Sequence, residues 1–148
     1  MKTAFCWIGI FILISIASIF GKDIAQYFSA EFFSNQTIAI PQEQLDSWVY
    51  ELNKQFPTPY MVDKETKAIS ISSEEGQIIY KYSMINFTAQ QLKNKDFMIK
   101  MKDKITNNFC NDKERVGYLQ RGVSFVYMYY EKDQNLAGSF TIDKNACK

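Results

Sequence analysis

The apolar positions at the start of the chain form one uninterrupted run. The segment from Thr3 to Gly21 (TAFCWIGIFILISIASIFG) contains no charged residue. At about 1.5 Å per residue, a helix over this run is roughly 28 Å long, close to the ~30 Å hydrocarbon core of a bilayer. Apolar residues then continue at spacings of three and four positions: Ile24, Tyr27, Phe28 and Phe32. The pattern predicts an N-terminal membrane helix with a helical extension, residues 1–33.

This segment has two main interpretations. As an uncleaved signal-anchor it crosses the inner membrane through residues 4–20, and Lys2 favours an N-terminus in the cytoplasm with the rest of the chain in the periplasm. As a cleaved signal peptide it has Lys2 as its basic region and a cleavage site near Ala17, which releases a periplasmic or secreted protein. The unbroken apolar pattern favours the anchor over cleavage, and both over a buried helix of a soluble fold.

The pattern after residue 33 changes to that of a globular domain. Residues 34–41 are polar and end in a proline, which predicts a linker, and residues 42–148 predict one extracytoplasmic domain. Helical spacing follows Pro41 and ends before Pro57, with apolar positions at Leu45, Trp48, Val49, Leu52 and Phe56. A short strand over residues 60–62 and a β-hairpin of residues 67–72 and 77–87 come next.

The second half of the domain repeats the order of helix and hairpin. Residues 88–110 predict a long helix that begins with a Thr88–Gln91 capping box. A short helix over residues 112–120, ended by Gly122, leads to a second hairpin of residues 123–130 and 139–143. The strand at 123–130 is apolar on both faces and is expected to be central. The order α-ββ-α-α-ββ predicts an α+β fold with an antiparallel sheet of about four strands and helices on one face.

Composition excludes several kinds of function. The chain has 148 residues, 17 Lys and Arg, 16 Asp and Glu, and no His. The absence of His excludes His-dependent triads and His-ligated zinc, and the spacing of the acids forms no calcium loop. A balanced charge argues against nucleic-acid binding, which needs an excess of basic residues. We therefore expect no catalytic residues, no cofactor and no metal.

The three cysteines have different expected roles. Cys6 lies within the apolar run and is expected to be a small buried side chain. Cys110 and Cys147 are the remaining two, and two thiols in a small exported domain usually pair. A pair of reactive thiols is the alternative.

Tyrosines and two arginines are the candidates for partner binding. The strand patterns place Tyr residues on one strand of each hairpin, where they either stabilise the sheet through cross-strand pairs or form a binding face. The two arginines either make structural ion pairs or contact the partner. The candidate residues are Tyr80, Tyr82, Tyr127, Tyr129, Tyr130, Arg115 and Arg121.

The stretch from Phe109 to Cys147 (FCNDKERVGYLQRGVSFVYMYYEKDQNLAGSFTIDKNAC) has a helix ending in Cys, a short helix, Gly122, a Tyr-rich hairpin and a final Cys. It resembles small exported α+β envelope proteins of Gram-negative bacteria, of the quorum-sensing-regulated virulence factor type. The resemblance implies an envelope location, a bridge between Cys110 and Cys147, and no catalytic site. The anchor is a departure, because such proteins often carry a cleaved signal or a lipid.

These observations predict a membrane-tethered, non-catalytic binding or accessory protein of the bacterial envelope that acts through protein–protein contacts. Alternatives are a periplasmic immunity protein against an imported toxin, a small enzyme without histidine chemistry, and a structural subunit of a membrane complex. The expected partners are the inner membrane, through residues 4–20, and an envelope protein.

Overall fold

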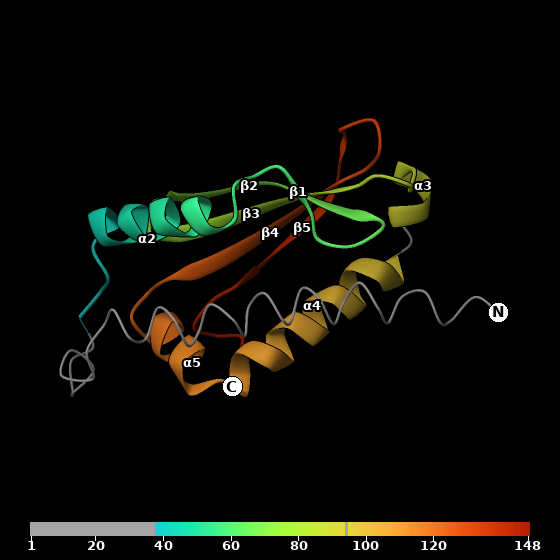
Figure 1. Ribbon diagram of the computed structural model, residues 1–148. Coiled ribbons are helices and arrows are strands. Elements are labelled where there is room, and N and C mark those ends of the chain that lie inside the picture. Colours follow the sequence, from blue (N-terminus) through green and yellow to red (C-terminus); the bar gives the residue numbers. More distant parts are fainter. Residues whose placement is uncertain (1–37, 94) are drawn as a thin grey trace.

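The computed structural model describes residues 38–93 and 95–148 (Figure 1). The predicted membrane segment 1–33 and residues 34–37 of the predicted linker lie outside these residues. In the part of the chain that the structure describes, no helix combines the length and the apolar composition needed to cross a bilayer. The described residues form a five-stranded sheet with helices packed against one face.

The first half of the domain agrees with the predicted helix and hairpin. Helix α2 (Gln42–Gln55) follows Pro41, buries Leu45, Val49 and Leu52, and is capped by Phe56 before the proline pair. Strands β1 (Tyr60–Met61), β2 (Thr66–Glu74) and β3 (Gln77–Met84) pair antiparallel in succession. The β2–β3 turn places Glu75 at φ 48° and Gly76 at φ 78°, a left-handed pair typical of tight hairpin turns. Strand β3 ends three residues earlier than predicted, because the Phe87 amide bonds back to the Met84 carbonyl in a turn.

The predicted helix over residues 88–110 is two helices, α3 (Ala89–Leu92) and α4 (Lys95–Cys110). The predicted capping box is present: the Thr88 amide donates to Gln91 Oε1 at 2.9 Å, and the Gln91 amide donates to Thr88 Oγ1 at 3.4 Å. Residues 93–95 are all polar, so this stretch offers no apolar side chain that would bury a continuous helix against the sheet. The predicted short helix is α5 (Lys113–Gln120), with Asp112 as its N-cap.

The sheet differs from the predicted one in strand number and in direction. Strands β4 (Ser124–Tyr130) and β5 (Leu136–Ile142) form the second hairpin, and the strand order is β1-β2-β3-β4-β5. Strands β3 and β4 run parallel, so the sheet is mixed rather than antiparallel. The connection between them contains three helices and returns the chain to the end of the sheet where β3 began, as parallel pairing requires. The alternation of apolar and polar residues within a strand does not indicate whether it pairs parallel or antiparallel with its neighbour.

The two faces of the sheet have different surroundings. On β4, Phe125, Tyr127 and Tyr129 are buried, whereas the side chains between them are partly exposed. The buried face carries the helices: α2 packs on β2 and α4 lies along β5 (Figure 1). We call the other one the helix-free face. Strand β4 is thus an inner strand, as its apolar pattern predicted.

The last residue of α4 is joined to the C-terminal tail. Cys110 and Cys147 lie at disulfide distance, with an S–S separation of 2.05 Å and a Cα–Cα separation of 5.2 Å. The covalent loop between them contains α5, β4 and β5. This is the pairing expected from the cysteine count.

Candidate functional site

Four of the predicted tyrosines come together on the face that carries the helices. The parallel register pairs Tyr80 with Tyr127 and Tyr82 with Tyr129. The paired rings are stacked, with centroids 5.2 Å apart in the first pair and 5.5 Å apart in the second. We call these four residues the tyrosine cluster. Cross-strand aromatic pairs of this kind stabilise a sheet, which is the structural one of the two predicted roles.

Among residues 38–93 and 95–148, a ring contact between a helix and the cluster is made by α4. Phe97 of α4 meets Tyr129 edge-on at a centroid distance of 6.1 Å. Within the described residues, the ring contacts of Tyr80, Tyr82 and Tyr127 all come from the sheet, including a stack of Tyr127 on Phe140 at 5.2 Å. The middle of the cluster therefore lies between the two flanking helices.

Burial keeps the cluster uncharged. It raises the pKa of Tyr80 to about 12, an effect that the nearby Arg115 guanidinium partly offsets. Burial also raises the pKa values of Tyr82, Tyr127 and Tyr129 well above the usual range. The Tyr129 hydroxyl is buried without a hydrogen-bond partner among the described residues. Neutral phenols with raised pKa values are poor general bases near neutral pH, so the cluster offers packing rather than acid–base chemistry.

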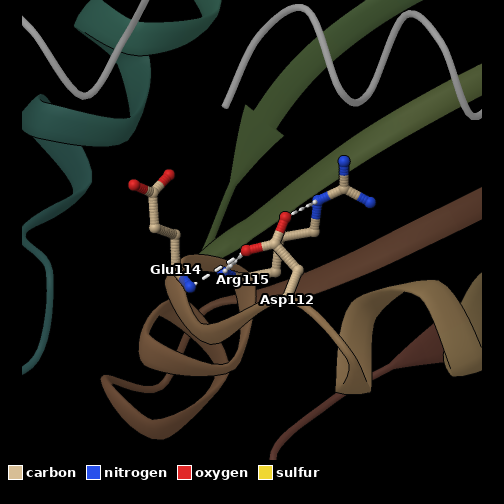
Figure 2. A network of polar contacts seen from close by, with 3 residues as sticks. All are labelled: Asp112, Glu114 and Arg115. Atoms are coloured by element: carbon tan, nitrogen blue, oxygen red, sulfur yellow. Dashed lines mark hydrogen bonds and ion pairs between the residues drawn. The ribbon is translucent and has the colours of Figure 1, made fainter. Parts of the chain in front are cut away.

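The two predicted arginines lie at either end of α5. Figure 2 shows Asp112 accepting from the Glu114 and Arg115 amides, at 3.0 and 3.3 Å, and pairing with Arg115 Nε at 3.2 Å. The Arg115 guanidinium also lies 5.3 Å from the centre of the Phe109 ring. Arg121 Nε donates to the Ile38 carbonyl at 3.1 Å, so it holds the entrance to α2. Both side chains make contacts within the domain.

Tyr130 is separated from the other candidates, because alternation places it on the helix-free face. There it follows Met128 and Val126 along β4, and Ile79 lies beside Val126 on β3. All four side chains are partly exposed. They form an apolar strip that we call the helix-free patch, bordered by Ser70, Ser72, Lys81, Ser139 and Thr141.

The apolar residues on both faces of β4 were the sequence signal for this patch, but burial of both faces in the core was another explanation for them. A strand that is apolar on both faces suggests a central strand covered on both sides. Here β4 is inner in the sheet, yet the helices described cover one face only. The solvent-facing positions of a sheet are usually polar, whereas those of the helix-free patch are apolar.

Sequence reasoning also missed a buried carboxylate in the β4–β5 turn. Glu131 is 2 % exposed and accepts hydrogen bonds from the amides of Asp133 and Asn135 and from the Asn135 side chain, at 2.7 to 3.0 Å. These bonds hold the pKa of Glu131 below its usual range. The residue organises the turn, and only its position after an apolar strand distinguished it in the sequence.

Metal-ligating residues do not gather in the described part of the chain. No three Cys, Asp or Glu side chains lie there in positions that could hold a metal ion. The adjacent carboxylates Glu74 and Glu75 lie at a hairpin turn and are both exposed.

Comparison with known proteins shows the fold. No protein-family model matches the sequence, and no curated protein matches it in sequence. Among solved structures, a protein of Pseudomonas aeruginosa described as secreted matches with a TM-score of 0.58 and 16% identity, over 72% of this chain and 96% of that one. The pilotin EpsS of the Vibrio vulnificus type 2 secretion system matches with a TM-score of 0.54 and 13% identity, over 72% and 91% of the two chains. The pilotin AspS of the Vibrio cholerae type II secretion system follows with a TM-score of 0.51 and 10% identity, over the same shares. The described domain is similar to these proteins in fold.

Proposed function

We propose that this protein is a non-catalytic accessory protein of the bacterial cell envelope that binds another envelope protein. The helix-free patch is the observation that carries the proposal. An apolar centre with a polar border, on a face without helices, has the arrangement of a protein-binding surface. The neutral, buried tyrosine cluster gives no support to acid–base catalysis.

The structural neighbours support the same class of function. They comprise a protein described as secreted and two pilotins of secretion systems, and all come from Gram-negative bacteria. A small α+β domain of this fold therefore occurs in proteins that work outside the cytoplasm. We extend this location to the present chain, with its domain in the periplasm.

The proposal includes a membrane tether. Residues 1–33 form the anchor and its extension, residues 34–41 the linker, and residues 42–148 the periplasmic domain. The intact mass of the protein purified from membranes tests this division. A mass for the uncleaved chain, resistant to extraction at high pH, supports the anchor, whereas a chain beginning after Ala17 makes the protein periplasmic or secreted.

Partner binding is tested by cross-linking from the helix-free patch. The full-length chain carrying Met128→p-benzoylphenylalanine is irradiated in its native membranes and the products are identified by mass spectrometry. We expect one predominant adduct with an envelope protein. An adduct with a toxin would identify an immunity protein, and the absence of any protein adduct would overturn the patch as the binding surface.

A charge substitution gives an independent measurement. Met128→Glu places a carboxylate at the centre of the apolar strip and should reduce capture of the same partner at least tenfold, because a buried unpaired charge costs several kcal/mol. The control is Tyr50→Glu on α2, whose side chain is 61 % exposed. Equal loss in both variants, or none in either, would contradict a specific role of the patch.

A further inference from the structure

A lysine borders the apolar strip of the helix-free patch. Alternation along β3 places Lys81 on the same face as Ile79, and the parallel register sets it beside Met128. On its other side lies Ser70 of β2. Its side chain is partly exposed, and among the described residues it makes no ion pair. The patch therefore combines apolar side chains with an uncompensated positive charge.

The other charges of this face do not compensate Lys81. In the strands that the structure describes, the remaining charged side chains on the helix-free face are Lys67 and Glu74. Lys67 is also basic. Glu74 pairs with Gln77, which precedes Lys81 on β3 by about 13 Å along the strand. No carboxylate of these strands is therefore within reach of the Lys81 ammonium.

The strand pairing beneath the patch favours a second covering layer. Strands β3 and β4 are parallel, and parallel strands in proteins are usually covered on both faces. The helices described cover one face of this pair. On the other face, the apolar strip continues to the edge of the sheet, where Leu136 lies beside Tyr130 and is 47 % exposed. A partner placed on the helix-free patch would supply the second layer.

We propose that the partner's contact surface is apolar and carries a carboxylate that pairs with Lys81; this rests on the proposed function, because it specifies the partner of the same patch. Apolar cover removes water from the Lys81 ammonium, and a buried charge is costly unless it is paired. The patch therefore selects an acidic partner and rejects a basic one.

Two other occupants fit the charge less well. A second copy of this chain, docked through the same patch, would bring another ammonium instead of a carboxylate. Clusters that bind an anionic membrane contain about four to eight basic residues, whereas the described strands place Lys67 and Lys81 on this face. A protein with an acidic and apolar surface remains the occupant that complements the patch.

Carbodiimide cross-linking of the full-length chain in native membranes tests the pairing. A water-soluble carbodiimide joins a lysine amine to a carboxylate in direct contact, without a spacer. We expect an amide link between Lys81 and an Asp or Glu of the protein that Met128→p-benzoylphenylalanine captures. If that capture succeeds but Lys81 gives no link to the captured protein, the pairing is wrong and the proposed function stands. A photo-adduct of position 128 with phospholipid and not with protein would overturn both and assign the face to the membrane.

Substitutions at Lys81 give a second measurement. Lys81→Glu should reduce photo-capture of the partner from position 128 by about tenfold or more, because like charges then meet across the interface. Lys81→Arg keeps the positive charge and should retain capture, but a guanidinium does not couple, so the carbodiimide link should disappear. Lys100→Glu, at an exposed position of α4, makes the same charge change away from the patch and should leave capture unchanged. Thermal unfolding checks that each variant is folded, and unchanged capture by folded Lys81→Glu would overturn the pairing.

Discussion

Removing the bond between Cys110 and Cys147 should destabilise the domain severely. The bond ties the end of α4 to the C-terminal tail across 37 residues of sequence, and the loop it closes contains α5 and both strands of the second hairpin. Serine at both positions keeps the side chains small. It also avoids the free thiol that a single substitution would leave to exchange.

The expected size follows from the loop. In the chain-entropy description, closing a loop of this length stabilises the folded state by about 4 kcal/mol. Typical domains have a free energy of unfolding of about 5–15 kcal/mol, so the loss is a large fraction of the total. The melting temperature should fall by roughly 10 °C or more.

Guanidinium unfolding of the purified full-length chain, followed by circular dichroism, measures the difference. The double variant C110S/C147S should unfold at lower denaturant, with a slope at least as steep as the parent's, because its unfolded chain exposes more surface. Cys6→Ser is the control, since Cys6 lies outside the loop, and it should leave the midpoint unchanged.

Two results would refute this reasoning. A loss below about 1 kcal/mol would show that the loop entropy is not what the bond contributes. Two reactive thiols at positions 110 and 147 in the folded, unreduced protein would show that the pair is not a disulfide. The second result would return the cysteines to the alternative of reactive thiols.

Three further predictions concern ionisable and polar side chains. Tyr129→Phe removes a buried hydroxyl without a partner, so thermal unfolding should show equal or greater stability, by up to about 1 kcal/mol; a clear loss would reveal an undetected bond. Because burial raises the pKa values of Tyr80 and Tyr118 to about 12, the unfolded chain releases protons first, and stability measured by denaturation should fall as pH rises from about 10 to 12. The pKa of Glu131 is lower in the folded chain than in the unfolded chain. Its carboxylate therefore stabilises the fold at pH values above the unfolded pKa, and this stabilisation is lost as the pH falls through the folded pKa. Glu131→Gln should lower the melting temperature at pH 7 and should reduce the fall in melting temperature that the parent protein shows in acid. An unchanged acid profile would assign Glu131 no role in the turn.

Local signals in the sequence predicted the elements well. The proline pair ended α2, and the capping box at Thr88 began α3. Each of these depends on a few neighbouring residues. The break between α3 and α4 was missed because the apolar stripe continues across it, while the polar residues 93–95 at the break only weaken the helix.

The parts that were not predicted depend on contacts between distant residues. The parallel pairing of β3 with β4 follows from the path of the connection, which alternation in either strand cannot reveal. The same pairing decided which candidate residues meet: it stacked Tyr80 on Tyr127, while alternation along β4 sent Tyr130 to the opposite face. The alternation of residues along each strand predicted which tyrosines share a face, but it did not predict which face the helices cover.

The parallel junction of β3 with β4 also has a consequence for how the chain folds. Strands β1 to β3 pair with near neighbours in sequence, as do β4 and β5, so each group can form early and independently. The β3–β4 contact closes a loop that contains α3, α4 and α5. The conformational entropy lost on closing this loop is offset only when those helices pack on the sheet. The covalent loop between Cys110 and Cys147 includes α5 from this connection, but it leaves α3 and α4 outside and does not provide a much shorter path from β3 to β4. Joining the two halves of the sheet is therefore expected to be the late and slow step, and β3 and β4 are the strands whose edges remain unpaired until it occurs.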